Sequence, residues 1–240
     1  MIKADLHVHT VLSPCGDIEM TPAFIIAKAK ESGLGIIGIT DHNSTLQCAE
    51  IKRIGDKEGV FVLCGAEVTT KEEVHVLAFV DGQENLEKLQ NYITKHLPKI
   101  PNNVGFFGYQ LVVNEKEEII KEEEYLLISA IDQSIDQIEE FVHSLGGIFI
   151  PAHIDKRQNS VLSQLGFLPP GLKVDALELT KHIDIDTFTS QNSYLKKYCI
   201  IKSSDAHFPG DFGEIYTKLN IDVPSFNAVK EALVKNILPL

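Results

Sequence analysis

The apolar positions of this chain follow two alternating patterns: short continuous runs, and longer stretches at helical spacing. The short runs have the length and composition of buried strands. We expect strands at 4–9, 35–40, 60–64, 74–80, 148–150, 176–179 and 199–202. Because helical stretches separate most of these runs, the pattern predicts the repeated strand–helix units of an α/β protein.

Capping residues indicate where several helices begin. Thr21 before Pro22 is a favourable N-cap with proline in the first turn, and Ser134 and Gln137 have the spacing of a capping box. Further helices are expected over 46–58, 86–96 and 225–235.

The segment 98–124 interrupts this order. Prolines and a glycine between 98 and 105 predict an irregular connection, and the runs 110–113 and 118–121 predict a small hairpin. We therefore expect a single barrel domain over 1–240 with an insert at about 98–124. About seven strands favour a closed or nearly closed parallel barrel, with an open doubly wound sheet as the alternative.

Composition narrows the class of protein. With 44% apolar and 23% charged residues, the chain has the profile of a soluble globular protein. No apolar run approaches the ~18 residues of a membrane span, and the start has no leader-like features, which predicts a cytoplasmic protein with no membrane partner. The four cysteines form no C-x-x-C pair, so we expect reduced thiols.

The formal net charge of −12 bears on the partner. Sequence-independent binding of nucleic acid needs a basic surface, so this charge predicts no extended nucleic-acid surface. Bound cations would offset part of the charge, which leaves a small phosphorylated substrate as the expected partner.

Ligand-type side chains gather at the ends of the expected strands, where a parallel barrel has its active site. Six of the nine histidines lie at such ends, and strand alternation places His7 and His9 on one face. The rest of the set is Asp41, His42, Glu67, His75, His153, Asp205 and His207.

Each of these residues has an ordinary explanation when taken alone; Asp41, for example, could simply orient His42. Together they would be costly to bury at one barrel mouth unless cations compensated them, so we expect a metal site. Imidazole and carboxylate ligands without thiolate suit zinc, manganese or iron. Eight or nine candidate ligands are too many for one ion and imply two or three divalent metals.

The motifs, in this order, resemble the PHP (polymerase and histidinol phosphatase) superfamily of metal-dependent phosphoesterases. They are Asp-Leu-His-Val-His-Thr at 5–10, Thr-Asp-His-Asn at 40–43, Gly-Ala-Glu at 65–67, His75, Pro-Ala-His at 151–153 and Ser-Asp-Ala-His at 204–207. The resemblance implies a distorted seven-stranded (β/α) TIM-like barrel with a trinuclear site. It implies the metal ligands His7, His9, Asp17, His42, Glu67, His75, His153, Asp205 and His207, with Glu67 as the bridging carboxylate.

The ligand that follows the first motif is the least defined. The stretch 13–17 is longer than the common Ser-Asp-Gly form of the family. Asp17 is the expected ligand and Cys15 the alternative, and a turn with an exposed Asp17 is the non-functional explanation. A Cys15 thiolate would shift the metal preference toward zinc.

The expected chemistry is phosphoester hydrolysis by a metal-bound hydroxide, with Asp17, His207 or His182 as the general acid. Lys156, Arg157 and His182 are the expected substrate-binding residues, although the two neighbouring cations also fit a solvated loop. The expected substrate is a nucleotide, an oligonucleotide, or a sugar or amino-alcohol phosphate.

Two other functions compete with this one. An amidohydrolase also begins with His-x-His, but it requires a bridging lysine near the fourth strand, where His75 stands. A non-catalytic, metal-stabilised module is the third class, although the ligand set here looks complete. The sequence does not specify the oligomeric state.

Overall fold

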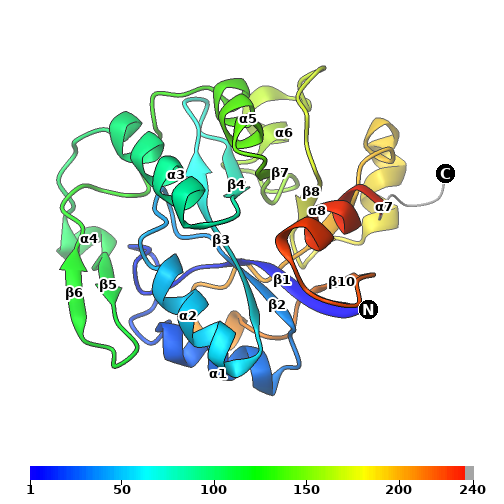
Figure 1. Cartoon of the computed structure of the whole chain (residues 1–240). Helices are drawn as coiled ribbons and strands as arrows, with labels where there is room; N and C mark the ends of the chain where they lie inside the picture. The colour runs from blue at the N-terminus through cyan, green and yellow to red at the C-terminus, as the bar shows by residue number, and fades with distance from the viewer. Residues whose placement is uncertain (236–240) are drawn as a thin grey trace.

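The computed structural model describes residues 1–235 and shows an α/β fold built on one curled sheet (Figure 1). The order of its six strands is β10–β1–β2–β3–β4–β7. Their bounds are β1 (Ile2–Val8), β2 (Ile36–Ile39), β3 (Phe61–Thr69), β4 (His75–Phe79), β7 (Ile148–Pro151) and β10 (Thr217–Leu219). A separate parallel pair consists of β8 (Leu177–Leu179) and β9 (Ile200–Lys202).

The curled sheet is a half-barrel, which corrects the expected seven-stranded parallel barrel. Backbone hydrogen bonds join the β8–β9 side to the segments that follow β7 and β1, from Ile154 N to Glu178 O (2.8 Å) and from His9 N to Ala206 O (3.0 Å). The strands do not all run parallel, because β4 is antiparallel to both β3 and β7. Only residues 70–74 separate β3 from β4, and a parallel crossover needs a dozen or more residues.

Apolar side chains cover both faces of the strands. Ile37 of β2 belongs to a cluster with Ile25 of the first helix, and the neighbouring Ile36 belongs to a second cluster with Leu6 and Leu233. This alternation follows from the two-residue period of a strand. Burial of both faces leaves the strand ends as the place where polar side chains can meet.

The main helices begin where the capping residues predict. Thr21 Oγ1 accepts a hydrogen bond from Phe24 N (3.2 Å), and Ser134 and Gln137 form both bonds of a capping box. The helices are α1 (Pro22–Glu31), α2 (Cys48–Glu58), α3 (Gln83–His96), α5 (Ile135–Ser144), α6 (Val161–Leu165), α7 (Ile185–Gln191) and α8 (Phe226–Lys235), with short 3-10 turns at Ser193–Leu195 and Pro209–Asp211. The sequence pattern did not predict α6, α7 or β10, each of which is seven residues or fewer.

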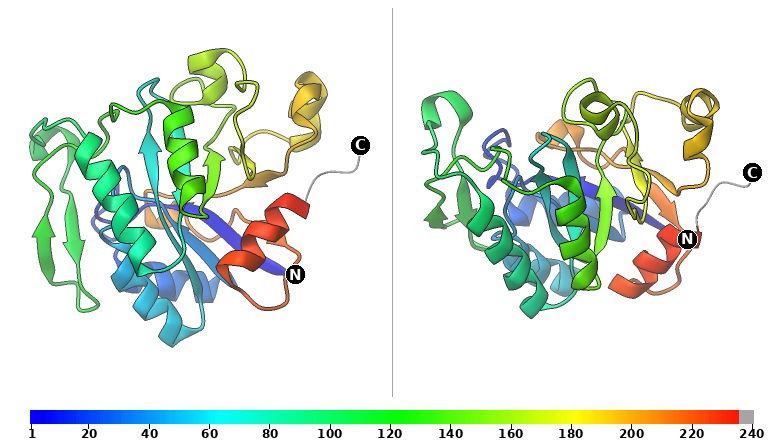
Figure 2. Two further views of the ribbon diagram at one scale, coloured as in Figure 1. Left: turned by 45° about the horizontal axis from the view of Figure 1, so that its top comes forward. Right: turned by 90° about the horizontal axis from the view of Figure 1, so that it is seen from above.

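The predicted hairpin insert is confirmed as β5 (Leu111–Val113) and β6 (Ile119–Glu122), preceded by α4 (Val104–Phe107). It stands at one side of the half-barrel, far from α8 (Figure 2). Leu111 N donates to Val11 O (3.3 Å), so the insert packs on the loop that follows β1.

No helix within residues 1–235 is long and apolar enough to cross a bilayer.

Candidate metal centre

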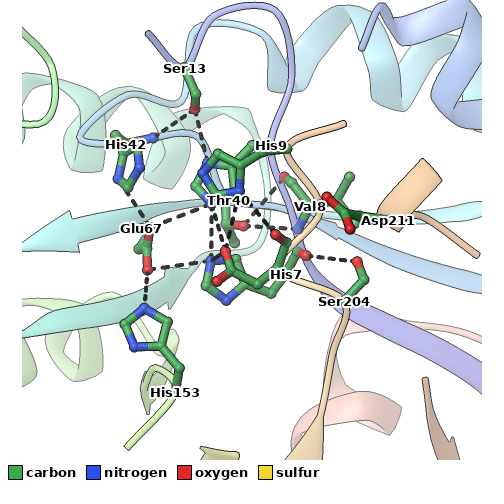
Figure 3. Close-up of polar contacts among 12 residues, drawn as sticks. His7, Val8, His9, Ser13, Thr40, His42, Glu67, His153, Ser204 and Asp211 are labelled. Atoms are coloured by element: carbon green, nitrogen blue, oxygen red, sulfur yellow. Dashed lines mark hydrogen bonds and ion pairs between the residues drawn. The ribbon is translucent and has the colours of Figure 1, made fainter. Parts of the chain in front are cut away.

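His7 and His9, at the end of β1, point their Nε2 atoms at a common centre 3.1 Å apart (Figure 3). Their other ring nitrogens are held by the protein. His7 Nδ1 lies 2.9 Å from Glu178 Oε2, and His9 Nδ1 lies 2.9 Å from Ser13 Oγ. Because a carboxylate only accepts, His7 Nδ1 carries the proton and its Nε2 lone pair is available to a cation.

Ser13 is held in turn by Asp41, which is 1% exposed. The Asp41 carboxylate accepts bonds from Ser13 Oγ (2.7 Å), Thr10 Oγ1 (2.8 Å) and Thr10 N (2.7 Å). Asp41 therefore anchors the loop after β1 and orients His9 through Ser13. None of these three bonds reaches the His42 side chain, so they do not support the alternative in which Asp41 orients His42.

Glu67 is the centre of the cluster, because its two carboxylate oxygens face five imidazoles. Figure 3 shows four of them, those of His7, His9, His42 and His153. Oε1 lies 2.9 Å from His75, 3.1 Å from His153 and 3.4 Å from His7. Oε2 lies 3.0 Å from His42 and 3.4 Å from His9. Glu67 is 1% exposed and lies within β3, which extends five residues past the strand expected from the sequence.

Asp205 and His207 reach the same centre from the segment after β9. A parallel bridge between Val8 and Ala206 sets this segment beside β1, and Asp205 Oδ1 lies 3.3 Å from His7 Nε2. The rings of His207 and His9 stack with centroids 4.0 Å apart. Asp205 has a φ of +52°, a conformation that costs about 1 kcal/mol or more for a non-glycine residue, as is common at functional sites.

Charge and burial oppose each other throughout the cluster. Burial alone would raise the pKa of Glu67, but the imidazoles of His75 and His7 hold that pKa well below its usual range. Burial likewise disfavours a charged His42, yet the Glu67 carboxylate raises the pKa of His42 to about 10. The Glu67 carboxylate thus favours the protonated form of His42, and a metal cation would displace that proton on binding.

The structure brings Cys15, and not Asp17, to the cluster. Burial acts to raise the pKa of the Cys15 thiol, but hydrogen bonds with His207 and His42 lower it to about 6. Asp17 Oδ1 instead accepts from Glu19 N (2.8 Å), a local turn contact. Within residues 1–235, neither Asp17 nor the exposed Cys15 belongs to a group of three ligand-type atoms within 4.8 Å, so the contacts of Cys15 with His42 and His207 are what favours it.

The three expected substrate-binding residues lie differently. Lys156 and His182 line a cavity of about 180 Å³ beside the cluster, and the Lys156 ammonium pairs with Asp205. Arg157 is exposed, does not line this cavity, and makes no ion pair within residues 1–235.

Glu178 is a site residue that sequence reasoning missed. It stands in β8, between Leu177 and Leu179, and it is 2% exposed. Its Oε2 accepts from His7 Nδ1 and from His153 N (3.0 Å). The available signal was alternation, because a glutamate between Leu177 and Leu179 faces away from both leucines.

The donor atoms fit divalent cations. Three overlapping groups have all their ligand atoms within 4.8 Å of one another: His9–His42–His207, His7–His9–Glu67 and His42–Glu67–His75. Imidazole nitrogens with carboxylate oxygens suit zinc, manganese or iron. Because the groups share members, the arrangement suits a cluster of ions better than one isolated ion.

Solved structures share this fold. The lesion-specific endonuclease PfuEndoQ from Pyrococcus furiosus superposes with a TM-score of 0.73 at 19% identity, covering 98% of this chain and 56% of that chain. Endonuclease Q in complex with a 27-mer duplex carrying an abasic lesion at its active site gives a TM-score of 0.71 at 20% identity, covering 97% and 56%. At these identities the likeness shows the fold.

These structures correct the expectation about partners. The net charge of −12 predicted a small substrate and no extended nucleic-acid surface. A protein with this fold nevertheless takes duplex DNA at its active site. Net charge is a poor guide because it sums the whole surface and leaves out bound metal, whereas DNA meets one face. The exclusion of nucleic acid therefore does not stand.

The amino-acid sequence is also similar to known proteins. YqxK of Bacillus subtilis (strain 168), an uncharacterized protein, is 25% identical over 264 residues, covering 97% of this chain and 62% of that relative. The chain thus spans less than two thirds of this relative. The sequence model of the PHP domain matches residues 5–157, which hold the ligand motifs from His7 to His153. The resemblance read from the motifs is confirmed, and the chain belongs to the PHP-domain family.

Proposed function

We propose that this chain is a metal-dependent phosphoesterase that cleaves a P–O ester bond with water. The observation that carries the proposal is the convergence of five imidazoles on the buried Glu67 carboxylate. Such a group is costly to bury unless cations balance it. Membership of the PHP-domain family supports the same conclusion.

In this proposal two or three ions of zinc, manganese or iron are held by residues of the cluster. The proposed ligands are His7, His9, Cys15, His42, Glu67, His75, His153, Asp205 and His207. Bound metals of this kind activate water near neutral pH and offset charge that develops on a phosphoryl group.

The protein's own groups have separate tasks. Glu178 and Ser13 fix the rings of His7 and His9 so that the Nε2 atoms face the centre. Lys156, paired with Asp205 at the cavity, is placed to meet a substrate phosphate. Asp17 is not retained as the general acid, because its carboxylate binds its own turn, and His207 and His182 remain the candidates.

Phosphodiesters of DNA belong among the proposed substrates. An endonuclease of this fold takes duplex DNA with an abasic lesion at its active site. Phosphomonoesters remain candidates as well, because the same cluster can serve either ester.

Hydrolysis by the metal-loaded protein tests the function. We expect release of product from at least one of bis(p-nitrophenyl) phosphate, p-nitrophenyl phosphate, nucleoside monophosphates and DNA duplexes with or without an abasic site. Chelation should remove the activity, and added manganese or zinc should restore it. Protein that binds two or more equivalents of metal and cleaves none of these esters would contradict the proposal. Cleavage of lactones or cyclic amides instead would favour an amidohydrolase.

A cobalt spectrum tests whether Cys15 is a ligand. With Co²⁺ bound, a thiolate ligand gives a sulfur-to-cobalt charge-transfer band in the near ultraviolet. We expect this band in the wild type, its loss in Cys15→Ser, and a zinc affinity in that variant at least about tenfold lower. Asp17→Asn is the control and should keep the band. A wild-type protein that binds cobalt without the band would remove Cys15 from the ligand set.

A further inference from the structure

A cavity of about 180 Å³ adjoins the metal cluster on the side of β8 and β9. His153 and Asp205 form the wall that it shares with the cluster. Because β8 and β9 run parallel, their carboxyl ends reach the same edge, and Glu178 and Ser203 line the cavity from there. A substrate whose phosphate lies at the cluster would therefore extend part of its organic group into this cavity.

Two polar groups of this lining are buried and have an oxygen without a partner. Glu178 is 2% exposed and Ser203 is 3% exposed, and neither Glu178 Oε1 nor Ser203 Oγ makes a hydrogen bond within residues 1–235. A buried polar atom without a partner is destabilising, and such atoms in native proteins call for an explanation. The other Glu178 oxygen, Oε2, accepts hydrogen bonds from His7 Nδ1 and from His153 N.

The charges around the cavity restrict what it can bind. Three carboxylates line it, Glu178, Asp205 and Asp211, so a second anion is disfavoured. Two ammonium groups also line it, and each already pairs with a carboxylate: Lys156 with Asp205, and Lys181 with Asp211. The two ammonium groups balance two of the three carboxylates, so little net charge remains to attract a cation. An uncharged group that carries hydrogen-bond donors suits the cavity best.

We propose that this cavity binds the hydroxyl-bearing sugar of the substrate, with hydroxyl groups donating to Glu178 Oε1 and pairing with Ser203 Oγ. Carboxylates recognise ribose hydroxyls in this way in other nucleotide sites. A hydroxyl both donates and accepts, so it can satisfy a carboxylate oxygen and a serine hydroxyl together. The inference rests on the proposed phosphoesterase function and adds its substrate class: a phosphate ester of a hydroxylated sugar, free or within a strand.

Matched probes that differ only in hydroxyl groups test the proposal. Adenosine monophosphate and its dideoxy analogue, which lacks both ribose hydroxyls, are titrated calorimetrically into the metal-loaded protein. A site built to bind a hydroxyl strongly rejects the analogue without it, so we expect at least about 100-fold weaker binding of the dideoxy compound. The dinucleotide ApA and its deoxy counterpart show whether a sugar within a strand is recognised in the same way.

Ser203→Ala tests the residue itself. Because Ser203 Oγ has no hydrogen-bond partner in the described part of the chain, the substitution breaks no hydrogen bond there. In this variant the ratio of the dissociation constants of the dideoxy and hydroxylated probes should fall roughly fivefold, which corresponds to the loss of one neutral hydrogen bond. Ser190→Ala on α7, whose hydroxyl donates to Thr187 O, is the matched control and should keep the full preference.

The outcomes separate this inference from the function on which it rests. Equal binding of the hydroxylated and dideoxy probes, or binding of neither mononucleotide nor dinucleotide, overturns the sugar pocket even if phosphate esters are hydrolysed. A clear hydroxyl preference without hydrolysis of any phosphate ester supports the pocket and contradicts the phosphoesterase. A preference seen only with the dinucleotide supports the pocket and assigns the sugar to a strand.

Discussion

Replacing Glu67 by glutamine is expected to lower phosphoester hydrolysis at least about 100-fold and to reduce bound metal by one equivalent or more. The amide keeps the size of the side chain but removes the negative charge that five imidazoles face. Mutation of a residue that hydrogen-bonds to a metal ligand already lowers metal affinity or activity about 10–100-fold, and Glu67 is itself a proposed ligand. Steady-state rates with elemental analysis of the same samples measure both effects.

Glu139→Gln is the matched control for this substitution. Glu139 is also a buried glutamate, 6% exposed, and it contacts an imidazole, His143, outside the cluster. Its replacement should leave metal content and rate unchanged. If Glu67→Gln kept its full complement of metal and its activity, the assignment of Glu67 as the central carboxylate would be wrong.

Removal of metal is expected to lower the melting temperature by about 5–10 °C. A ligand present at 100 times its Kd stabilises the folded state by about 2.7 kcal/mol, and each kcal/mol shifts the Tm of a domain of this size by about 2–4 °C. The loss of stability would come from the buried cluster, where the imidazoles lie close together without a cation between them. Burial and the neighbouring His207 already hold the pKa of His9 well below its usual value. Calorimetric melting of chelator-treated and zinc- or manganese-loaded protein measures the shift.

The same variants control for nonspecific metal effects. Glu139→Gln should show the full metal-dependent rise in Tm, and Glu67→Gln should show little of it. A wild-type Tm that stays the same on chelation and reloading would mean that the cluster does not depend on metal for its stability.

Much of the fold was predictable because it depends on local patterns. Short continuous apolar runs identified the strands, and Thr21 and Ser134 marked two helix starts through bonds that span three residues. The antiparallel β3–β4 pair was also predictable from its short connection, and the expectation of an all-parallel barrel overlooked it. The position of the β8–β9 pair beside the half-barrel was not predictable, because it depends on bonds such as His9 N to Ala206 O that join distant segments.

The sequence by itself identified the side chains that the structure brings together around Glu67: motifs at successive strand ends pointed to His7, His9, His42, Glu67, His75, His153, Asp205 and His207. The tertiary structure alone decided the supporting partners. It brought Cys15 to His42 and His207 and left Asp17 in its own turn. It also placed Glu178 on His7, across 171 residues of chain. The physical reason is that strand alternation depends on neighbouring residues, whereas a buried carboxylate meets its partner only when the curled sheet brings distant segments together.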